Sequence, residues 1–131
     1  MKLITRDTDY AIRALCYIAK NKKETISVKE LVLRLKIPRP FLRKILQTLN
    51  NKKILKSHKG KGGGFKLAKT PCKIELLGLM KIFQGPFKIS EHIFKNSPCP
   101  HKKTCKLKKK LDNIERYVIS KLKGITLASL L

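Results

Sequence analysis

The chain has 131 residues, 42% of them hydrophobic, so its size and apolar content suit one compact domain and argue against a disordered chain. Its 32 lysine and arginine residues outnumber its 8 aspartate and glutamate residues, and the resulting net charge of +24 favours a polyanionic partner. The sequence has no run of about 18 apolar residues, which excludes a transmembrane helix.

Residues 8–21 predict the first helix, because apolar side chains recur there at helical spacing on one face. Asp7 or Thr8 can accept hydrogen bonds from the free N–H groups at the start of this helix. A second helix is predicted after Ser27, since Ser27 and Glu30 have the spacing of a capping box and apolar residues follow them.

The two prolines of residues 37–40 end the second helix and predict the start of a third, because proline suits the first turn of a helix. The third helix continues to residue 50 or 51 with apolar side chains at helical spacing, namely Phe41, Leu42, Ile45, Leu46 and Leu49. We therefore expect these five side chains to form its buried face.

The spacing then becomes that of two short strands, residues 54–58 and 65–69. The glycines of residues 59–64 between them can adopt the positive φ angles of a flexible hairpin tip. Three helices followed by a basic, glycine-tipped hairpin are the element order of a winged helix-turn-helix.

Residues 74–84 predict a further apolar helix, and residues 85–104 a loop. A long last helix, about residues 105–123, carries apolar side chains at spacings of three and four, namely Leu107, Leu111, Ile114, Val118 and Leu122. This seam indicates either a dimer interface, which we favour, or packing onto the chain's own domain. The predicted fold is mainly α with a small β-hairpin wing, with a DNA-binding domain at 1–84 and a sensor loop and dimerisation helix at 85–131.

A helix in the major groove needs polar side chains opposite its buried face, and the third helix has them. Arginine can bind guanine through two hydrogen bonds, glutamine can pair with adenine, and the lysines of the wing can reach phosphates. The alternative is an ordinary solvated face, together with a lysine-rich coding bias. The candidate contacts to double-stranded DNA are Ser27, Arg39, Pro40, Arg43, Lys44, Gln47, Lys59, Lys61 and Gly62.

The four cysteines are expected to be thiols or metal ligands, because the first residues lack a signal-peptide pattern and a cytoplasmic location is therefore expected. Cys99 and Cys105 flank a short basic segment whose lysines favour thiolates, so they can hold iron or zinc or act as a redox pair. We expect Cys16 to be a buried core thiol, whereas Cys72 is ambiguous.

Several segments resemble those of the Rrf-type regulators, the family of the IscR and NsrR repressors. They are residues 10–15, 26–31, the wing residues 59–69 and the C-terminal residues 124–130, so the resemblance covers essentially the whole chain. It implies a homodimer that binds a palindromic operator, with the last helix exchanged between subunits. In the wing, Lys59 stands in the place of the family's arginine. Arg43 stands where IscR repressors carry a glutamate, which implies a different operator sequence.

Many members of this family hold an iron–sulfur cluster on three cysteines before the last helix. Cys99 and Cys105 match the second and third of these, but Ile93 stands at the position of the first, and Lys108 stands where IscR has its ligating histidine. Asp9 matches the carboxylate that NsrR-like members donate to the partner subunit's cluster. The resemblance thus implies a 2Fe–2S cluster on Cys99, Cys105 and Asp9, with a fourth ligand among His92, His101 and Cys72.

The leading hypothesis is a transcription factor, a repressor, that senses oxygen, nitric oxide or redox state through this cluster. A second hypothesis is a cluster-free member of the family that responds to thiol oxidation or to a protein partner. A third is a protein that binds nucleic acid or the ribosome without sequence preference. An enzyme is the least favoured class, because the sequence has no acid–base pair, nucleophile arrangement or phosphate-binding loop.

Overall fold

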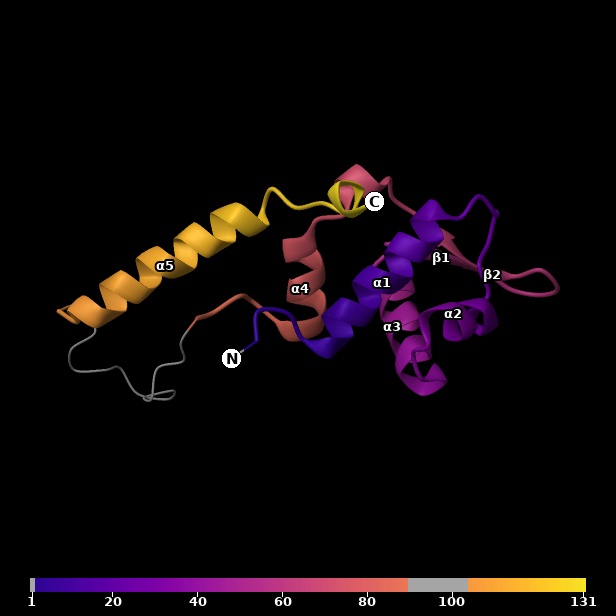
Figure 1. Ribbon diagram of the computed structural model, residues 1–131, viewed down its shortest axis with the longest axis horizontal. Helices are drawn as coiled ribbons and strands as arrows, with labels where there is room; N and C mark the ends of the chain where they lie inside the picture. The colour runs from indigo at the N-terminus through magenta and orange to yellow at the C-terminus, as the bar shows by residue number, and fades with distance from the viewer. Residues whose placement is uncertain (1, 90–103) are drawn as a thin grey trace.

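The computed structural model describes residues 2–89 and 104–131 of the chain (Figure 1). Its elements, in order, are α1 Arg6–Lys20, α2 Val28–Leu35, α3 Arg39–Asn51, β1 Leu55–His58, β2 Gly64–Leu67, the short 3-10 helix η1 Pro71–Lys73, α4 Leu76–Gln84, α5 Lys106–Leu122 and the 3-10 helix η2 Ala128–Leu130. The predicted mainly helical fold with a two-stranded wing is confirmed.

Helix α1 begins two residues earlier than predicted, and its cap is neither Asp7 nor Thr8. Thr5 has an extended backbone and accepts a hydrogen bond from the backbone N–H of Thr8 at 3.5 Å. Asp7 and Asp9 lie in the first turn, where carboxylates interact favourably with the positive end of the helix dipole. Thr8 is fully buried, so its side chain serves packing and internal hydrogen bonding.

Helix α2 begins as the capping-box spacing predicts, since Oγ of Ser27 accepts from the backbone N–H of Glu30 at 3.1 Å. The Glu30 side chain does not form the reciprocal hydrogen bond of a capping box, in which it would accept from the Ser27 backbone N–H. Its Oε1 accepts from the Tyr17 hydroxyl at 2.9 Å and from the Lys23 ammonium at 3.1 Å. These hydrogen bonds, with Lys23 first, lower the pKa of Glu30 and join α2 to α1 and to the segment between them.

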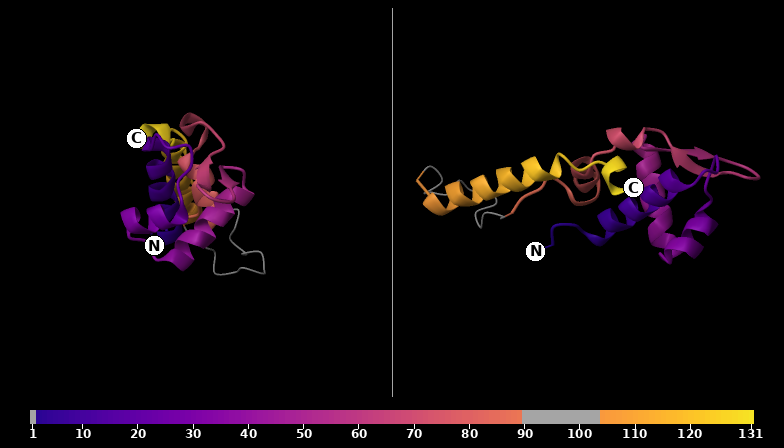
Figure 2. Two further views of the ribbon diagram at one scale, coloured as in Figure 1. Left: turned by 90° about the vertical axis from the view of Figure 1, so that its right-hand side faces the viewer. Right: turned by 45° about the horizontal axis from the view of Figure 1, so that its top comes forward.

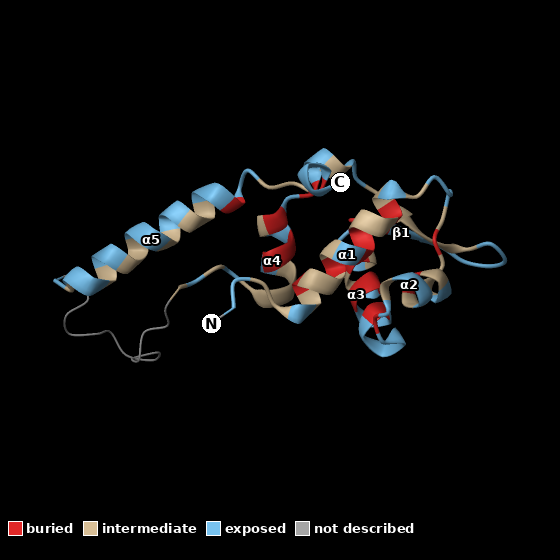
Figure 3. Cartoon of the chain, viewed as in Figure 1, coloured by how far each residue is buried: buried red, intermediate tan, exposed pale blue. Residues whose placement is uncertain are grey.

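The main core lies where α1 meets α3, α4 and the hairpin. On α1, the fully buried Ala11 and Ala14 allow neighbouring helices to approach closely, and the buried faces of the helices point toward one another (Figure 3). Cys16 is not a fully buried core thiol as predicted, because it lies at the edge of this core and is only partly buried. Burial nevertheless raises the pKa of the Cys16 thiol, against an opposing effect of Lys20.

The wing is an antiparallel pair in which Leu55 faces Leu67 and His58 faces Gly64; each strand is one residue shorter than predicted, and β2 begins one residue earlier, at Gly64. Strand β2 is joined to the residue before Ser27, because Ile26 and Phe65 exchange both backbone hydrogen bonds, at 2.9 and 2.8 Å. Gly64 is required at this approach, since a Cβ there would lie 2.3 Å from the Ile26 carbonyl oxygen. The wing and the start of α2 are thus held together.

Helix α5 extends away from the winged-helix body, as Figure 1 and the right-hand view of Figure 2 show. Among the described residues, the C-terminal half of α5 contacts the rest of the chain: Leu122 is buried in a second small core with Leu76 and Met80, and the Ile89 N–H donates to Oε1 of Glu115 at 3.1 Å. Towards its start the predicted seam lies open, with Leu107 66% and Ile114 51% exposed. Packing onto the chain's own domain, the alternative to a dimer interface, therefore accounts for the apolar side chains at the C-terminal end of α5 and not for Leu107 and Ile114.

The chain after α5 returns to the winged-helix body. The backbone N–H of Leu127 donates to the Ile74 carbonyl at 2.8 Å, and the Leu76 N–H donates to the Ile125 carbonyl at 3.0 Å. Leu127 is buried in the main core. These contacts anchor the end of α5 beside α4. Within the described residues, no helix is both long and apolar enough to cross a membrane.

Candidate nucleic-acid interface

Helix α3 has one buried and one exposed face, as its sequence predicts. Leu42, Ile45, Leu46 and Leu49 are buried, while all five predicted DNA-contacting side chains of this helix are exposed, namely Arg39, Pro40, Arg43, Lys44 and Gln47. Pro38 is the N-cap and Pro40 lies in the first turn, so the missing proline N–H costs no helical hydrogen bond. The cationic face of α3 is therefore available to a partner along its length.

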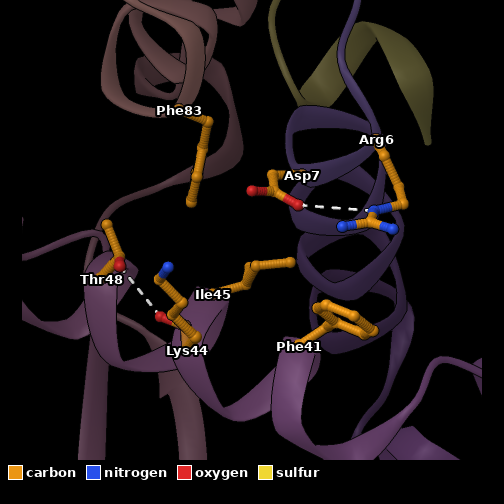
Figure 4. Close-up of a pocket in the computed structure, with 7 residues that line it drawn as sticks. All are labelled: Arg6, Asp7, Phe41, Lys44, Ile45, Thr48 and Phe83. Carbon is orange, nitrogen blue, oxygen red and sulfur yellow. Dashed lines mark hydrogen bonds and ion pairs between the residues drawn. The ribbon is translucent and has the colours of Figure 1, made fainter.

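Phe41 is the exception to the predicted buried face, because its side chain is 40% exposed. The guanidinium group of Arg6, at the start of α1, lies over the Phe41 ring at 4.5 Å from the centroid. Beside this pair is a hollow of about 130 Å³ between α1, α3 and α4 (Figure 4), lined by Arg6, Asp7, Phe41, Lys44, Ile45, Thr48 and Phe83. Sequence reasoning missed Arg6, since nothing near it in the chain indicates its contact with α3.

The tip of the wing carries the other predicted contacts, and Lys59, Lys61 and Gly62 are all exposed there. The tip is tied to the segment before α2, because the Thr25 hydroxyl donates to the Gly62 carbonyl at 2.8 Å. Ser27 is half-buried, and its oxygen is occupied by the Glu30 N–H, which leaves its hydroxyl proton free to donate.

The strands of the wing add two lysines that sequence reasoning did not single out. Lys56 and Lys66 are directly opposite each other in the hairpin register. Like charges at such positions repel, and nearby phosphates would relieve this repulsion. In β1 Leu55 is buried, while Lys56 and the two residues after it are exposed.

The predicted cluster ligands are not gathered in the described part of the chain. Cys105 is the N-cap of α5, and its Sγ accepts from the Lys108 N–H at 3.4 Å. Asp9 forms an ion pair at 2.8 Å with Arg13, one turn along α1. The start of α5 lies at the far end of the molecule from α1 (Figure 1). Cys99 and two candidate fourth ligands, His92 and His101, lie outside the described residues.

Cys72, the remaining candidate ligand, is exposed in η1, where its Sγ lies 3.5 Å from the Thr70 hydroxyl. Residues 2–89 and 104–131 contain no group of three histidine, cysteine, aspartate or glutamate side chains placed to hold a metal ion. Within one chain, Cys105 and Asp9 therefore do not fit a shared ligand set. A site that used both would have to combine residues from two subunits.

The sequence matches known proteins along most of its length. A protein of Aquifex aeolicus (strain VF5), named as an HTH-type transcriptional regulator, is 32% identical over 93% of this chain and 86% of its own length. The HTH-type transcriptional regulator NsrR of Halalkalibacterium halodurans is 28% identical over 98% of this chain and 89% of its own length.

Solved structures show the same fold at lower identity. CymR, the global cysteine regulator of B. subtilis, superposes with a TM-score of 0.78 at 21% identity, covering 99% of this chain and 96% of its own. IscR of T. potens gives a TM-score of 0.74 at 21% identity, covering 99% and 85%.

The family model named Rrf2, described as an iron-dependent transcriptional regulator, matches residues 4–131. This match spans the winged-helix body and α5 together. The family and its structural neighbours are regulators of transcription and not enzymes. The chain belongs to the Rrf2 family of DNA-binding transcriptional regulators.

Proposed function

We propose that the protein is a repressor that reads a palindromic operator as a homodimer. In this arrangement α3 lies in the major groove and the tip of the wing enters the adjacent minor groove. The observation that carries the proposal is the division of α3 into a buried apolar face and an exposed cationic face. The net charge of +24 supplies the long-range attraction to the duplex.

The exposed residues divide by the contacts that their side chains can make. Arg39 and Arg43, four residues apart on one side of α3, can each bind the O6 and N7 atoms of a guanine. Gln47 can bind an adenine in the same way. Phosphates are the partners of Lys44 and of the Ser27 hydroxyl, while Pro40 contacts the groove wall. The wing contributes Lys59, Lys61 and the backbone of Gly62.

The open seam of α5 supports the homodimer. Leu107 and Ile114 are exposed together with Tyr117, whereas, among the described residues, it is the C-terminal half of the helix that contacts the rest of the chain. A second copy of α5 placed along this seam would bury these side chains and relate two α3 helices by a two-fold axis. Two such helices read two half-sites of opposite orientation, which is a palindrome.

The proposed sensor is the segment between α4 and α5, with Cys99 and Cys105 as its reactive residues. The family description of an iron-dependent regulator and the relatives named NsrR and IscR support an iron–sulfur cluster, of the 2Fe–2S type, whose third ligand is Asp9 of the other subunit. The CymR neighbours, one of them an oxidised form, support the thiol alternative.

The DNA-reading proposal is tested with an operator selected from a random DNA library. Arg43→Ala should reduce the discrimination between this operator and random DNA by about tenfold or more, since one good base contact is worth about 1–3 kcal/mol. Arg116→Ala, which removes an exposed arginine from α5, is the matched control. Equal weakening on both DNAs would instead support binding without sequence preference.

The sensor proposal is tested by an absorbance spectrum and an iron count on anaerobically purified protein. Iron with visible absorbance that is lost in Cys105→Ser supports the cluster. Colourless protein whose operator binding responds to oxidant, and loses this response in Cys99→Ser, supports the thiol alternative. Operator affinity unaffected by iron, sulfide and oxidant would exclude both modes of sensing.

A further inference from the structure

The start of α1 lies against one shoulder of α3. Arg6 is the first residue of α1, and its side chain is 60% exposed. Its guanidinium lies over the ring of Phe41, whereas Lys44 follows one turn later on the same side of α3. Figure 4 shows Arg6 and Lys44 on opposite rims of the hollow that both line, with Phe83 of α4 above it.

We propose that Arg6 and Lys44 together clamp one phosphate of the DNA backbone at the edge of the major groove. This inference rests on the proposed placement of α3 in that groove. It adds α1, through Arg6, to the elements that contact DNA.

The dimensions of helix and groove favour this occupant. An α-helix with its side chains is about 10–12 Å wide, and the major groove is about 12 Å wide, so an inserted helix nearly fills it. Its two shoulders then face the two phosphate strands that border the groove. Phe41, Lys44 and Thr48 follow one another at spacings of three and four and so form one such shoulder.

The Phe41 ring holds the guanidinium of Arg6 in place before DNA arrives. A cation over an aromatic face is attracted to it, which restricts the otherwise mobile arginine side chain. A pre-positioned donor loses less conformational entropy on binding. This contact also gives a physical reason for a large aromatic side chain that the fold leaves 40% exposed.

The charges of the hollow leave it net positive. Arg6 and Lys44 contribute two cations, against one carboxylate from Asp7, whose Oδ1 lies 3.8 Å from the Arg6 Nε. Lys44 makes no ion pair with any residue that the structure describes. Asp7 would repel an approaching phosphate, so it should weaken the clamp without abolishing it.

The test is the salt dependence of DNA binding. The slope of log K against log salt concentration is negative, and each neutralised phosphate contributes about −0.9 to it. Arg6→Gln should therefore make the slope shallower, by up to about 0.9 because Lys44 still faces the same phosphate, and weaken binding by about 3- to 10-fold, by the same factor on operator and on random DNA. Asp7→Asn should strengthen binding to both DNAs.

Arg13→Gln is the matched control, because Arg13 is an equally exposed arginine of α1, with 62% of its side chain exposed, and is paired with Asp9 away from the hollow. It should leave the slope unchanged. Arg6→Lys keeps the positive charge and should retain the slope. In a Phe41→Leu background, Arg6→Gln should change the slope and the affinity less than it does in the unaltered protein, as expected if the ring positions the guanidinium. Circular dichroism melts verify that each variant is folded.

An unchanged slope in folded Arg6→Gln would overturn the clamp, as would a loss confined to the operator, which would indicate base reading. The proposed function is judged separately, by whether the unaltered protein discriminates operator from random DNA. If it binds both equally, the proposed function fails, and the slope of Arg6→Gln still decides on the clamp. Binding to neither DNA would overturn both proposals.

Discussion

The hydroxyl group of Thr8 lies 2.8 Å from Oε1 of Gln84, a contact that joins the start of α1 to the last residue of α4. The same oxygen accepts from the backbone N–H of Thr5 at 3.1 Å, and the Gln84 Nε2 donates to the Leu3 carbonyl at 3.0 Å. One amide side chain thus holds the N-terminal segment beside α4. Because the proposed sensor segment begins directly after Gln84, this contact also connects the start of that segment to α1.

Replacing Gln84 should destabilise the fold. Gln84→Ala removes the acceptor of the fully buried Thr8 hydroxyl, which keeps only its contact with the Thr5 hydroxyl at 3.1 Å, and the loss of such a hydrogen bond costs about 0.5–1.5 kcal/mol. Urea unfolding followed by circular dichroism measures the change. Gln47→Ala removes an exposed glutamine from α3 and serves as the control, with stability expected to change by less than about 0.5 kcal/mol. Equal losses in both variants would show that the Gln84 contacts contribute nothing.

Two glycines should respond to alanine in opposite directions. At Gly64 an added Cβ would lie 2.3 Å from the Ile26 carbonyl oxygen, so Gly64→Ala must separate the wing from the start of α2 and destabilise the protein. At Gly78, exposed within α4, a Cβ meets nothing within 4 Å, so Gly78→Ala should stabilise the helix by about 0.5–1 kcal/mol. Thermal melts compare the two, and a loss of stability in Gly78→Ala would contradict this expectation.

The contribution of Glu30 to the free energy of unfolding should depend on pH. The hydrogen bonds from Lys23 and Tyr17 lower its pKa from the ordinary value of 4.5, so the charged form is favoured in the folded state. A lowered carboxyl pKa stabilises the fold above the ordinary pKa, and this stabilisation is lost as pH falls through the folded-state pKa.

The difference in unfolding free energy between the unaltered protein and Glu30→Gln should therefore be largest near pH 6 and shrink as the pH falls from about 4.5 downward. Denaturant titrations at several pH values measure it. Glu24→Gln removes the same formal charge from an exposed position of the preceding segment and controls for the change in net charge. A difference that is constant between pH 6 and pH 3 would contradict the stabilising role of the Glu30 carboxylate.

The seam of α5 should control self-association. Leu107→Glu places a charge in the proposed interface and should convert dimer to monomer. Each loss of about 1.4 kcal/mol from the free energy of association raises the dimer dissociation constant about tenfold, and we expect at least that much. Leu33→Glu in α2 is a closely matched control, because both leucines are 66% exposed. Sedimentation velocity distinguishes the outcomes. A dimer that persists in Leu107→Glu, or an unaltered protein that is already a monomer, would contradict the proposed interface.

The sequence was sufficient to predict the order of the elements because the signals for them are local. Helical spacing, the Ser27 cap, the prolines around α3 and the glycines of the wing each act within a few residues of the structure they specify. For the same reason the exposed face of α3 was predicted residue by residue. Its arginines, lysine and glutamine lie opposite the buried leucines in the structure as they do in the helical spacing.

The features that were missed depend on residues far apart in the chain. Phe41 has the spacing of a core residue of α3. It lies at the surface, where Arg6 from the start of α1 covers its ring, and the sequence around Phe41 does not indicate this contact. The Glu30 carboxylate was assigned to the capping box, but Tyr17 and Lys23 bind it instead. Cys16 has the spacing of a core residue of α1 and yet lies at the edge of the core, because the packing of the helices decides where that core ends.

The paired hydrogen bonds between Ile26 and Phe65 join the hairpin to the segment that leads into α2, at a point two residues from the tip. The tip itself, residues 59–63, lies beyond this junction, is largely exposed and has one further hydrogen bond to that segment, from the Thr25 hydroxyl to the Gly62 carbonyl. Over evolution, insertions or deletions in the tip can change how far the hairpin reaches along a groove while its angle to α2 stays the same. Reach and angle can therefore vary independently among descendants of this chain.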